Sequence, residues 1–297
     1  MLKILDPMGN PVKTLARYKE LDGDVMVFEA EKADSYRVKA WRSKTGHVET
    51  TAIRQVRWTE VDVDHKVVKR MLKRADNDAK CPIEQAKKQA AALLASCKRA
   101  KKRVRQLCKA SGMDTLLTLT YRVLVADLAV AKRHLKEFHR RMVRVFPDFK
   151  FVAAFELQKR GCWHMHLATL GEALALQKVS LKSYNVIRAV WRSVTGELGG
   201  NIDVSRRKRN SSRSAASIAN YIAKYIAKDF EATEKWANRY ATYGVKVLDV
   251  DELDGVVSNL HEAIEFVFGC VGSADHVSFT SLSKFQDVFC LFAEPPR

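Results

Sequence analysis

The chain has 297 residues, of which 47% are hydrophobic, and this is enough to bury a sizeable core in one large unit or two to three smaller ones. No apolar run approaches the roughly 20 residues that span a bilayer, and residues 1–7 lack the apolar core of a signal peptide. These features argue against a membrane or secreted protein, so we expect a cytoplasmic location and no membrane partner.

The positive charge is concentrated in one part of the chain. The net charge is +18, but residues 246–297 hold three Lys or Arg against nine Asp or Glu, which leaves 49 basic and 25 acidic residues in positions 1–245. An excess of this size attracts polyanions, because Lys and Arg that neutralise phosphates release counterions. Nucleic acid is the first candidate partner, and an anionic membrane surface is the second.

Two common kinds of site are missing from the sequence. The six cysteines include no C-x-x-C pair, so we predict neither a zinc ribbon nor a disulfide framework and expect reduced thiols. The phosphate-binding sequence G-x-x-x-x-G-K-[ST] is also absent, so the chain shows no nucleotide-driven motor.

The amino-terminal part divides into two segments. Residues 1–80 contain short strand-like runs separated by Gly and Asp, and we predict an accessory β-rich region. Residues 81–111 are rich in Ala, Lys, Arg and Leu with Pro82 at the start, which predicts a long helix. The helix is either a solvated face or a phosphate-binding surface. Its candidate DNA-binding residues are Lys98, Arg99, Lys101, Lys102, Arg103 and Arg105, followed by Lys109.

Residues 112–245 have the element order of a compact α+β domain. We predict strands over 115–121, 151–158, 163–169 and 201–205, and helices over 128–145, 183–195 and 217–229. The helix over 128–145 carries His134 and His139, which we expect at the surface. This order is that of a ferredoxin-like, split βαβ antiparallel sheet with helices on one face. Residues 246–297 form an acidic carboxy-terminal extension in which we identify no chemistry.

The hairpin over 150–169 brings together three potential metal ligands. Gly161 suits the last position of a three-residue turn, and that register places Glu156 opposite His164. His166 lies on the same face as His164, and opposed side chains have Cβ atoms about 5 Å apart. A carboxylate and two imidazoles can hold a divalent ion with positions left for substrate, and Gln158 is a potential supporting or substitute ligand. The simpler reading is that the two histidines are only a polar strand face.

A helix downstream carries two tyrosines on one stripe. Tyr221, Lys224, Tyr225 and Lys228 recur at helical spacing, while the opposite side is apolar and suited to packing on a sheet. A tyrosine pair four residues apart is often structural. Here the tyrosines interleave with lysines, which suits a phenolate nucleophile whose phosphate target needs neutralising.

Together these segments resemble a known family. Residues 155–166 resemble the metal motif of the HUH endonucleases, residues 221–228 resemble their tyrosine motif, and residues 118–121 are similar to their first-strand motif. The metal motif precedes the tyrosines, as in rolling-circle replication initiators, and two tyrosines four apart are similar to the two-tyrosine type of phage and plasmid Rep proteins. The resemblance covers about residues 112–230.

The resemblance implies a nicking mechanism on single-stranded origin DNA. Mg²⁺ or Mn²⁺ held by Glu156, His164 and His166 would polarise the scissile phosphate, and Lys228, with Lys224, would balance charge. Either Tyr221 or Tyr225 would attack, leaving a 5′-phosphotyrosine and a 3′-hydroxyl for extension. A host helicase and polymerase are the implied protein partners, and the oligomeric state stays open. A second set of basic residues is a candidate DNA surface: Arg206, Arg207, Lys208, Arg209 and Arg213.

Two other classes of protein fit part of the pattern. A non-catalytic single-strand DNA-binding or regulatory protein on the same sheet would keep the charge but would not need Glu156 or Tyr221. A metal-dependent hydrolase would use His164 and His166, but no further His or Asp follows His166 at close fixed spacing.

Overall fold

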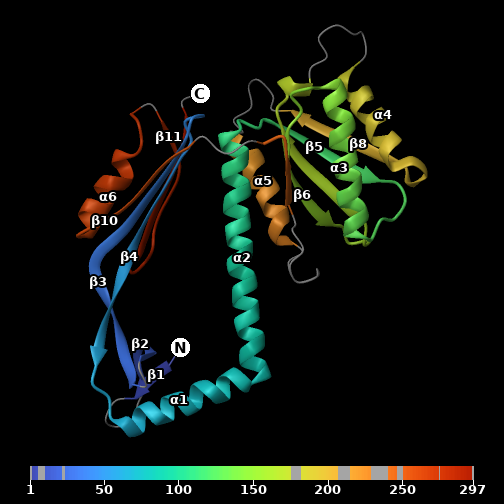
Figure 1. Ribbon diagram of the computed structural model, residues 1–297. Helices are drawn as coiled ribbons and strands as arrows, with labels where there is room; N and C mark the ends of the chain where they lie inside the picture. Colours follow the sequence, from blue (N-terminus) through green and yellow to red (C-terminus); the bar gives the residue numbers. More distant parts are fainter. Residues whose placement is uncertain are drawn as a thin grey trace. The chain divides into compact units, whose positions relative to one another are not determined.

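The computed structural model of the protein describes residues 2–5, 11–21, 24–174, 182–206, 215–228, 240–245, 250–273 and 275–295 (Figure 1). The chain forms two compact units. The first contains residues 1–42, 48–94 and 251–297, and the second contains residues 43–47 and 95–250. Within the described residues, no helix is both long enough and apolar enough to span a bilayer.

The second unit is built on a five-stranded antiparallel sheet. Its strands are β5 (Thr115–Tyr121), β6 (Phe151–Leu157), β7 (Trp163–Thr169), β8 (Gly200–Arg206) and β9 (Tyr240–Tyr243), in the order β8-β5-β7-β6-β9. With helices α3 (Leu128–Val145) and α4 (Ser183–Thr195) between the strands, the first four strands have the split βαβ arrangement expected from the sequence. The α+β fold class is therefore confirmed.

Helices cover both faces of this sheet, whereas the sequence analysis expected them on one face. On one face, α3 and α4 pack on Leu117, Leu119, Phe155 and Met165 (Figure 1). On the other face, the end of α2 (Pro82–Ala110) and α5 (Ala215–Lys228) pack on Val152, Ala154 and Ala168. The reason lies in β6 and β7, which are almost entirely buried and apolar on both sides, as a strand covered on two faces must be.

Short 3₁₀ turns flank α4. They are η1 (Glu172–Leu174) and η2 (Gly196–Leu198). Ser183 is the first residue of α4 rather than the capping residue expected, and Lys182 before it makes no side-chain cap.

The first unit holds a seven-stranded sheet. Its strands are β1 (Leu2–Leu5), β2 (Pro11–Leu21), β3 (Asp24–Ser43), β4 (Val48–Val61), β10 (Val250–Val257), β11 (His276–Leu282) and β12 (Val288–Glu294). The strand order is β1-β2-β3-β4-β12-β11, and β10 pairs with β3. Helix α6 (Leu260–Gly269) covers part of one face through Ala263 and Val267, and α1 (His65–Lys80) packs on Val27.

The carboxy-terminal segment is part of this first sheet. Strand β12 pairs with β4 over Val288–Ala293 and contributes Phe289, Leu291 and Ala293 to the core around Tyr36 and Val38. Residues 246–297 were treated in the sequence as a separate extension, but from residue 251 they belong to the same compact unit as residues 1–42. Helix α1 within the predicted β-rich region of residues 1–80 was not expected.

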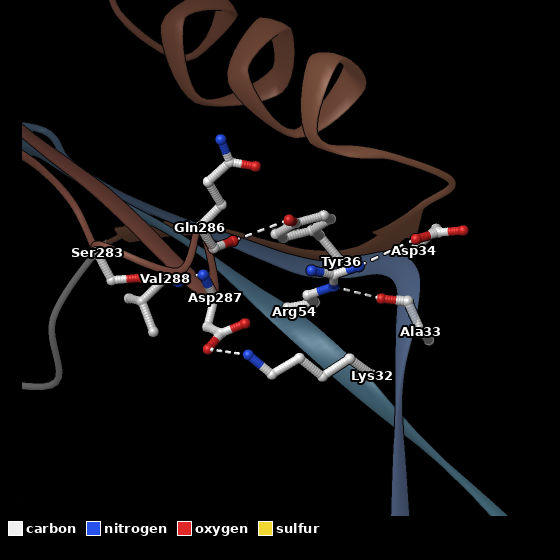
Figure 2. A network of polar contacts seen from close by, with 9 residues as sticks. All are labelled: Lys32, Ala33, Asp34, Tyr36, Arg54, Ser283, Gln286, Asp287 and Val288. Atoms are coloured by element: carbon white, nitrogen blue, oxygen red, sulfur yellow. Dashed lines mark hydrogen bonds and ion pairs between the residues drawn. The ribbon is translucent and has the colours of Figure 1, made fainter.

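A turn between β11 and β12 is tied to β3 and β4 by polar contacts (Figure 2). The Tyr36 hydroxyl donates to the Gln286 carbonyl over 2.8 Å, and Lys32 Nζ lies 2.8 Å from Asp287 Oδ2. Arg54 bonds the Ala33 carbonyl and pairs with Asp34, across the register shift in β3 between Lys32 and Tyr36. The irregular part of the long β3 strand is therefore held by groups from the far end of the chain.

Candidate active site on the five-stranded sheet

The β6–β7 hairpin forms in the register that its sequence predicts. Gly161 has φ +77°, which few residues other than glycine adopt, and the Gln158 N–H donates to the Cys162 carbonyl at 3.0 Å. Glu156 is paired with His164 and Ala154 with His166. The three polar side chains therefore share the face of the sheet that α5 covers.

Glu156 and His166 are in direct contact in this buried region. His166 Nε2 lies 2.7 Å from Glu156 Oε2, and both residues are less than 8% exposed. The other ring nitrogen, His166 Nδ1, lies 3.2 Å from the Thr118 hydroxyl of the neighbouring strand β5. Contacts at both nitrogens fix the orientation of the imidazole ring.

His164 is buried beside this pair and has an unsatisfied nitrogen. Its Nε2 atom has no hydrogen-bond partner among the described residues. Burial, followed by the nearby His166 and Arg160, lowers the pKa of His164 to about 4, against a weaker opposite effect of Glu156. His164 is therefore a neutral imidazole near pH 7, with a lone pair available to a ligand.

The three side chains suit a divalent metal in their chemistry. They supply one carboxylate and two imidazoles from rigid strands, and the unpartnered His164 nitrogen is a donor that a metal ion would satisfy. Across the part of the chain that the structure describes, however, no group of three or more His, Cys, Asp or Glu has metal-site geometry. Here Glu156 and His166 bond each other instead, so metal binding would require Glu156 to exchange that contact for the ion.

The tyrosines of α5 lie against the same histidine. The ring of Tyr225 is stacked on His166 with centroids 4.0 Å apart and an interplanar angle of 15°, and Tyr221 meets His166 edge-on at 6.0 Å. The Tyr225 hydroxyl donates to the Tyr221 hydroxyl over 2.7 Å. Ile222 and Ile226 on the opposite side of α5 are buried, as the helical stripe predicts.

The two phenols have different environments. Burial, then the hydrogen bond to Tyr221, raises the pKa of Tyr225 well above its ordinary value, with a smaller contribution from Glu156. Tyr221 is 41% exposed. Tyr225 is thus held as a neutral hydrogen-bond donor, while the Tyr221 oxygen accepts that bond and remains accessible to solvent.

The other predicted site residues lie in varied positions. Lys224 is exposed on the tyrosine side of α5, and the backbone of Lys228 ends that helix. Gln158 lies beyond the end of β6, where its side-chain oxygen accepts a bond from Arg160 Nε at 3.1 Å, so the structure gives it no contact with the histidines. Arg206 ends β8. The remaining basic residues of that segment lie outside the described residues: Arg207, Lys208, Arg209 and Arg213.

The basic helix has a more limited exposed surface than its sequence suggests. Lys98, Arg99, Lys102 and Arg103 are exposed, and Lys101 and Arg105 are half-buried. Lys109, which closes the basic run, is only 2% exposed and does not belong to that surface.

Three polar residues have roles that sequence reasoning missed. Thr118 contacts His166, and pairing β5 with β7 would have placed these two residues opposite each other. His134 and His139, expected at the surface, are instead half-buried in aromatic clusters. His134 lies 3.1 Å from the Tyr121 hydroxyl, and the ring centroid of His139 lies 5.0 Å from that of Tyr243.

Comparison with known proteins agrees with this location of the site. Residues 114–230, less than half of the chain, match the model of a family described as replication-associated protein ORF2. The matched segment contains the β6–β7 hairpin and both tyrosines of α5, and it supports a role as a replication initiator. No curated protein and no solved structure matches the chain.

Proposed function

We propose that this protein initiates DNA replication by nicking single-stranded origin DNA with a tyrosine of α5, and that it later rejoins the strand. The observation that carries the proposal is the stacking of Tyr225 on His166, with the hydroxyl of Tyr221 bonded to that of Tyr225. Two phenols thus stand beside a carboxylate and two imidazoles. The match to a replication-associated family and the resemblance to two-tyrosine HUH endonucleases support the same function.

The exposed Tyr221 is the better candidate for the first nucleophile. It is accessible, and its oxygen accepts a hydrogen bond from Tyr225 that would stabilise a developing phenolate. Tyr225 is anchored by its ring on His166 and would act second, after rearrangement. Lys224 on the same side of the helix, together with Lys228, would balance phosphate and phenolate charge.

The chemical step transfers one phosphodiester bond to the protein. The Tyr221 oxygen bonds the phosphorus, the bond from phosphorus to the 3′ oxygen breaks, and the DNA keeps its phosphate as a 5′-phosphotyrosine. The phenol releases its proton to solvent, and the departing 3′ oxygen takes up a proton. Because the ester is conserved, the reverse reaction can close the strand without an external energy source.

Glu156, His164 and His166 would hold Mg²⁺ or Mn²⁺. When bound, such an ion would stabilise negative charge on the scissile phosphate. Thr118 orients His166 through Nδ1, and the buried strands keep the other two side chains fixed. Because burial lowers the pKa of His164 to about 4, this imidazole needs no deprotonation to bind a cation near neutral pH.

The DNA would need additional contacts outside this site. The exposed Lys98, Arg99, Lys102 and Arg103 of α2, with Arg206 and the basic residues that follow it, are the proposed strand-binding groups. The free 3′-hydroxyl would be extended by a host polymerase behind a host helicase.

A non-catalytic DNA-binding protein is the alternative. The direct bond between Glu156 and His166 favours it, because a buried polar pair that satisfies itself can be purely structural.

Covalent attachment to DNA separates the two functions. The probe is a pool of random-sequence single-stranded oligonucleotides, labelled in one set at the 3′ end and in another at the 5′ end, incubated with protein and Mn²⁺. We expect only the 3′ label to migrate with the protein on a denaturing gel, and we expect EDTA or the Tyr221→Phe/Tyr225→Phe double variant to remove it. Retention of DNA on a native gel without an adduct under Mg²⁺ or Mn²⁺ would favour the binding protein.

A further inference from the structure

Helix α1 (His65–Lys80), outside the segment that matches the replication-associated family, is amphipathic with a strongly basic side. At 100° per residue, Val68, Met71 and Leu72 fall on one side of the helix, and five Lys or Arg fall on the other. The five are Lys66, Lys69, Arg70, Lys73 and Arg74, hereafter the α1 basic face.

The apolar side of α1 fixes the helix on the first sheet. Val68 and Met71 are each 7% exposed and pack with Val27 of β3, and Val61 and Leu72 extend the same cluster. The Asp64 side chain caps the helix by accepting from the Lys66 N–H at 2.7 Å. This packing leaves the opposite side of the helix as the one that can meet a partner.

All five residues of the α1 basic face are exposed, and none of them forms an ion pair within the residues that the structure describes. The ion pair of this helix, between Lys80 and Asp76 at 2.6 Å, lies in its last turn. No acidic residue occurs between Lys66 and Arg74. A helix face that only confers solubility normally mixes both signs of charge, so this face is unusual.

We propose that the α1 basic face binds the phosphate backbone of DNA, at a second surface separate from the tyrosine site. From residue 66 to residue 74 the helix rises by about 12 Å, and duplex DNA carries one charge per about 1.7 Å of its axis, so several phosphates lie within reach of the five side chains. Contacts of Lys and Arg to phosphate do not read base sequence, so the face would position flanking DNA.

The structure favours DNA over an anionic bilayer. A helix that lies in a membrane interface inserts its apolar side among the lipids, but the apolar side of α1 is already buried against β3. No aromatic residue occurs in α1 that could insert beside the lysines. Only the electrostatic attraction is left, and DNA satisfies it without apolar contact.

Equilibrium binding tests this surface without any need for cleavage. The full-length triple variant Lys69→Gln/Arg70→Gln/Lys73→Gln is compared with the control Arg133→Gln/Lys136→Gln/Arg144→Gln, which removes the same charge from exposed positions of α3. Fluorescent 30-mers of random sequence, single-stranded and duplex, are titrated in EDTA between 50 and 200 mM KCl.

The α1 variant is expected to bind at least about 10-fold more weakly at 50 mM KCl, and the slope of log affinity against log salt should become shallower by about 2 to 3. The control should stay within about 3-fold of the wild type, and the charge-conserving variant Lys69→Arg/Lys73→Arg should bind normally. An equal loss in both triple variants, or no loss in the α1 variant, would overturn the proposal.

Two further measurements keep the result interpretable. Melting temperatures establish that the variants fold, and if the triple variant melts early, Lys69→Gln/Lys73→Gln is measured instead with a slope change of about 1 to 2. Binding to phosphatidylserine vesicles that is lost in the α1 variant, while DNA binding is unchanged, would assign the face to membranes and refute the DNA proposal. Because cleavage is absent in EDTA, failure here is distinct from failure of the nicking proposal.

Discussion

Tyr221 and Tyr225 are one helical turn apart, yet their surroundings give them different tasks. Tyr225 stacks on His166 and donates its hydroxyl hydrogen, whereas Tyr221 accepts that hydrogen and is 41% exposed. An acceptor that is open to solvent can attack a phosphate, and a buried donor can support it. The helical stripe in the sequence predicts that both phenols point the same way, but it cannot assign these separate roles.

The first prediction concerns the two tyrosines separately. Tyr221→Phe should lower the rate of the first covalent step by more than about 100-fold, because it removes the attacking oxygen. Tyr225→Phe should lower it by about 10-fold, because the ring stays on His166 and only one hydrogen bond is lost. The measurement is a single-turnover time course of 3′-labelled adduct.

Tyr184→Phe provides the matched control for these rates. Tyr184 is an equally exposed tyrosine on α4 whose hydroxyl donates to the Ile202 carbonyl, away from the histidines. Its change should leave the rate unaltered. A Tyr225→Phe variant slower than Tyr221→Phe would reverse the assignment of roles.

His139 leads to a prediction on pH. Its Nε2 atom is buried without a hydrogen-bond partner among the described residues, beside Phe149, Phe151 and Tyr243. Burial lowers the pKa of His139, although a backbone hydrogen bond with Phe149 acts in the opposite direction. The unfolded chain therefore binds more protons than the folded protein as pH falls below about 6.5, so stability is lost in that range.

Urea midpoints between pH 7.5 and pH 5 test this effect. The wild type should lose stability toward pH 5, and His139→Leu should lose less of it. His261, whose side chain is 83% exposed on α6, serves as the control position, and His261→Leu should behave as the wild type. Equal pH slopes for the wild type and His139→Leu would exclude His139 as a source of the acid sensitivity.

At the scale of elements, local pattern predicts the site hairpin well. Strands 115–121 and 163–169, helix 128–145 and the pairing of Glu156 with His164 all agree with the sequence analysis. Each depends on turn chemistry or on hydrophobic period within about 20 residues. The continuous apolar run in β6 also signals a strand covered on both faces, which the single-face prediction overlooked.

The elements that sequence reasoning missed depend on distant contacts. Strand β12 pairs with β4, more than 200 residues earlier, and no local signal records that pairing. Helix α1 has a clear amphipathic period, but it follows a strand-rich segment and was absorbed into it. Thr118 acquires its contact with His166 only when β5 lies beside β7.

A third prediction tests the contribution of the carboxy-terminal strand. Leu291 is fully buried in the core formed with Tyr36 and Val38, so Leu291→Ala should cost about 2 to 5 kcal/mol. Val288 on the same strand is 39% exposed, and Val288→Ala should cost within about 0.5 kcal/mol. The measurement is hydrogen exchange of the amides of β3 and β12.

Amides of β5 and β7, in the other unit, serve as the internal reference for that experiment. Their protection should not change in Leu291→Ala, because these strands belong to a separate compact unit. Unchanged protection in β3 would mean that β12 does not stabilise the first sheet.

At the scale of the whole molecule, the chain separates chemistry from anchorage. The second unit carries the histidines, the glutamate and the tyrosines, and the family match lies within it. The first unit carries the α1 basic face and takes up the acidic carboxy-terminal segment as strands and a helix. The net charge of the sequence predicted a polyanionic partner, but the charge alone could not show that exposed cations occur in both units.

The most direct test of the central claim is to identify the residue that carries DNA after reaction with Mn²⁺. Trypsin separates the two tyrosines, since Lys224 lies between them, so Tyr221 falls in peptide 214–224 and Tyr225 in peptide 225–228. After nuclease trimming of the adduct formed in a single turnover, mass spectrometry should find a nucleotide on Tyr221. A nucleotide on a residue outside α5, or no modified peptide although the protein binds the DNA, would contradict the account.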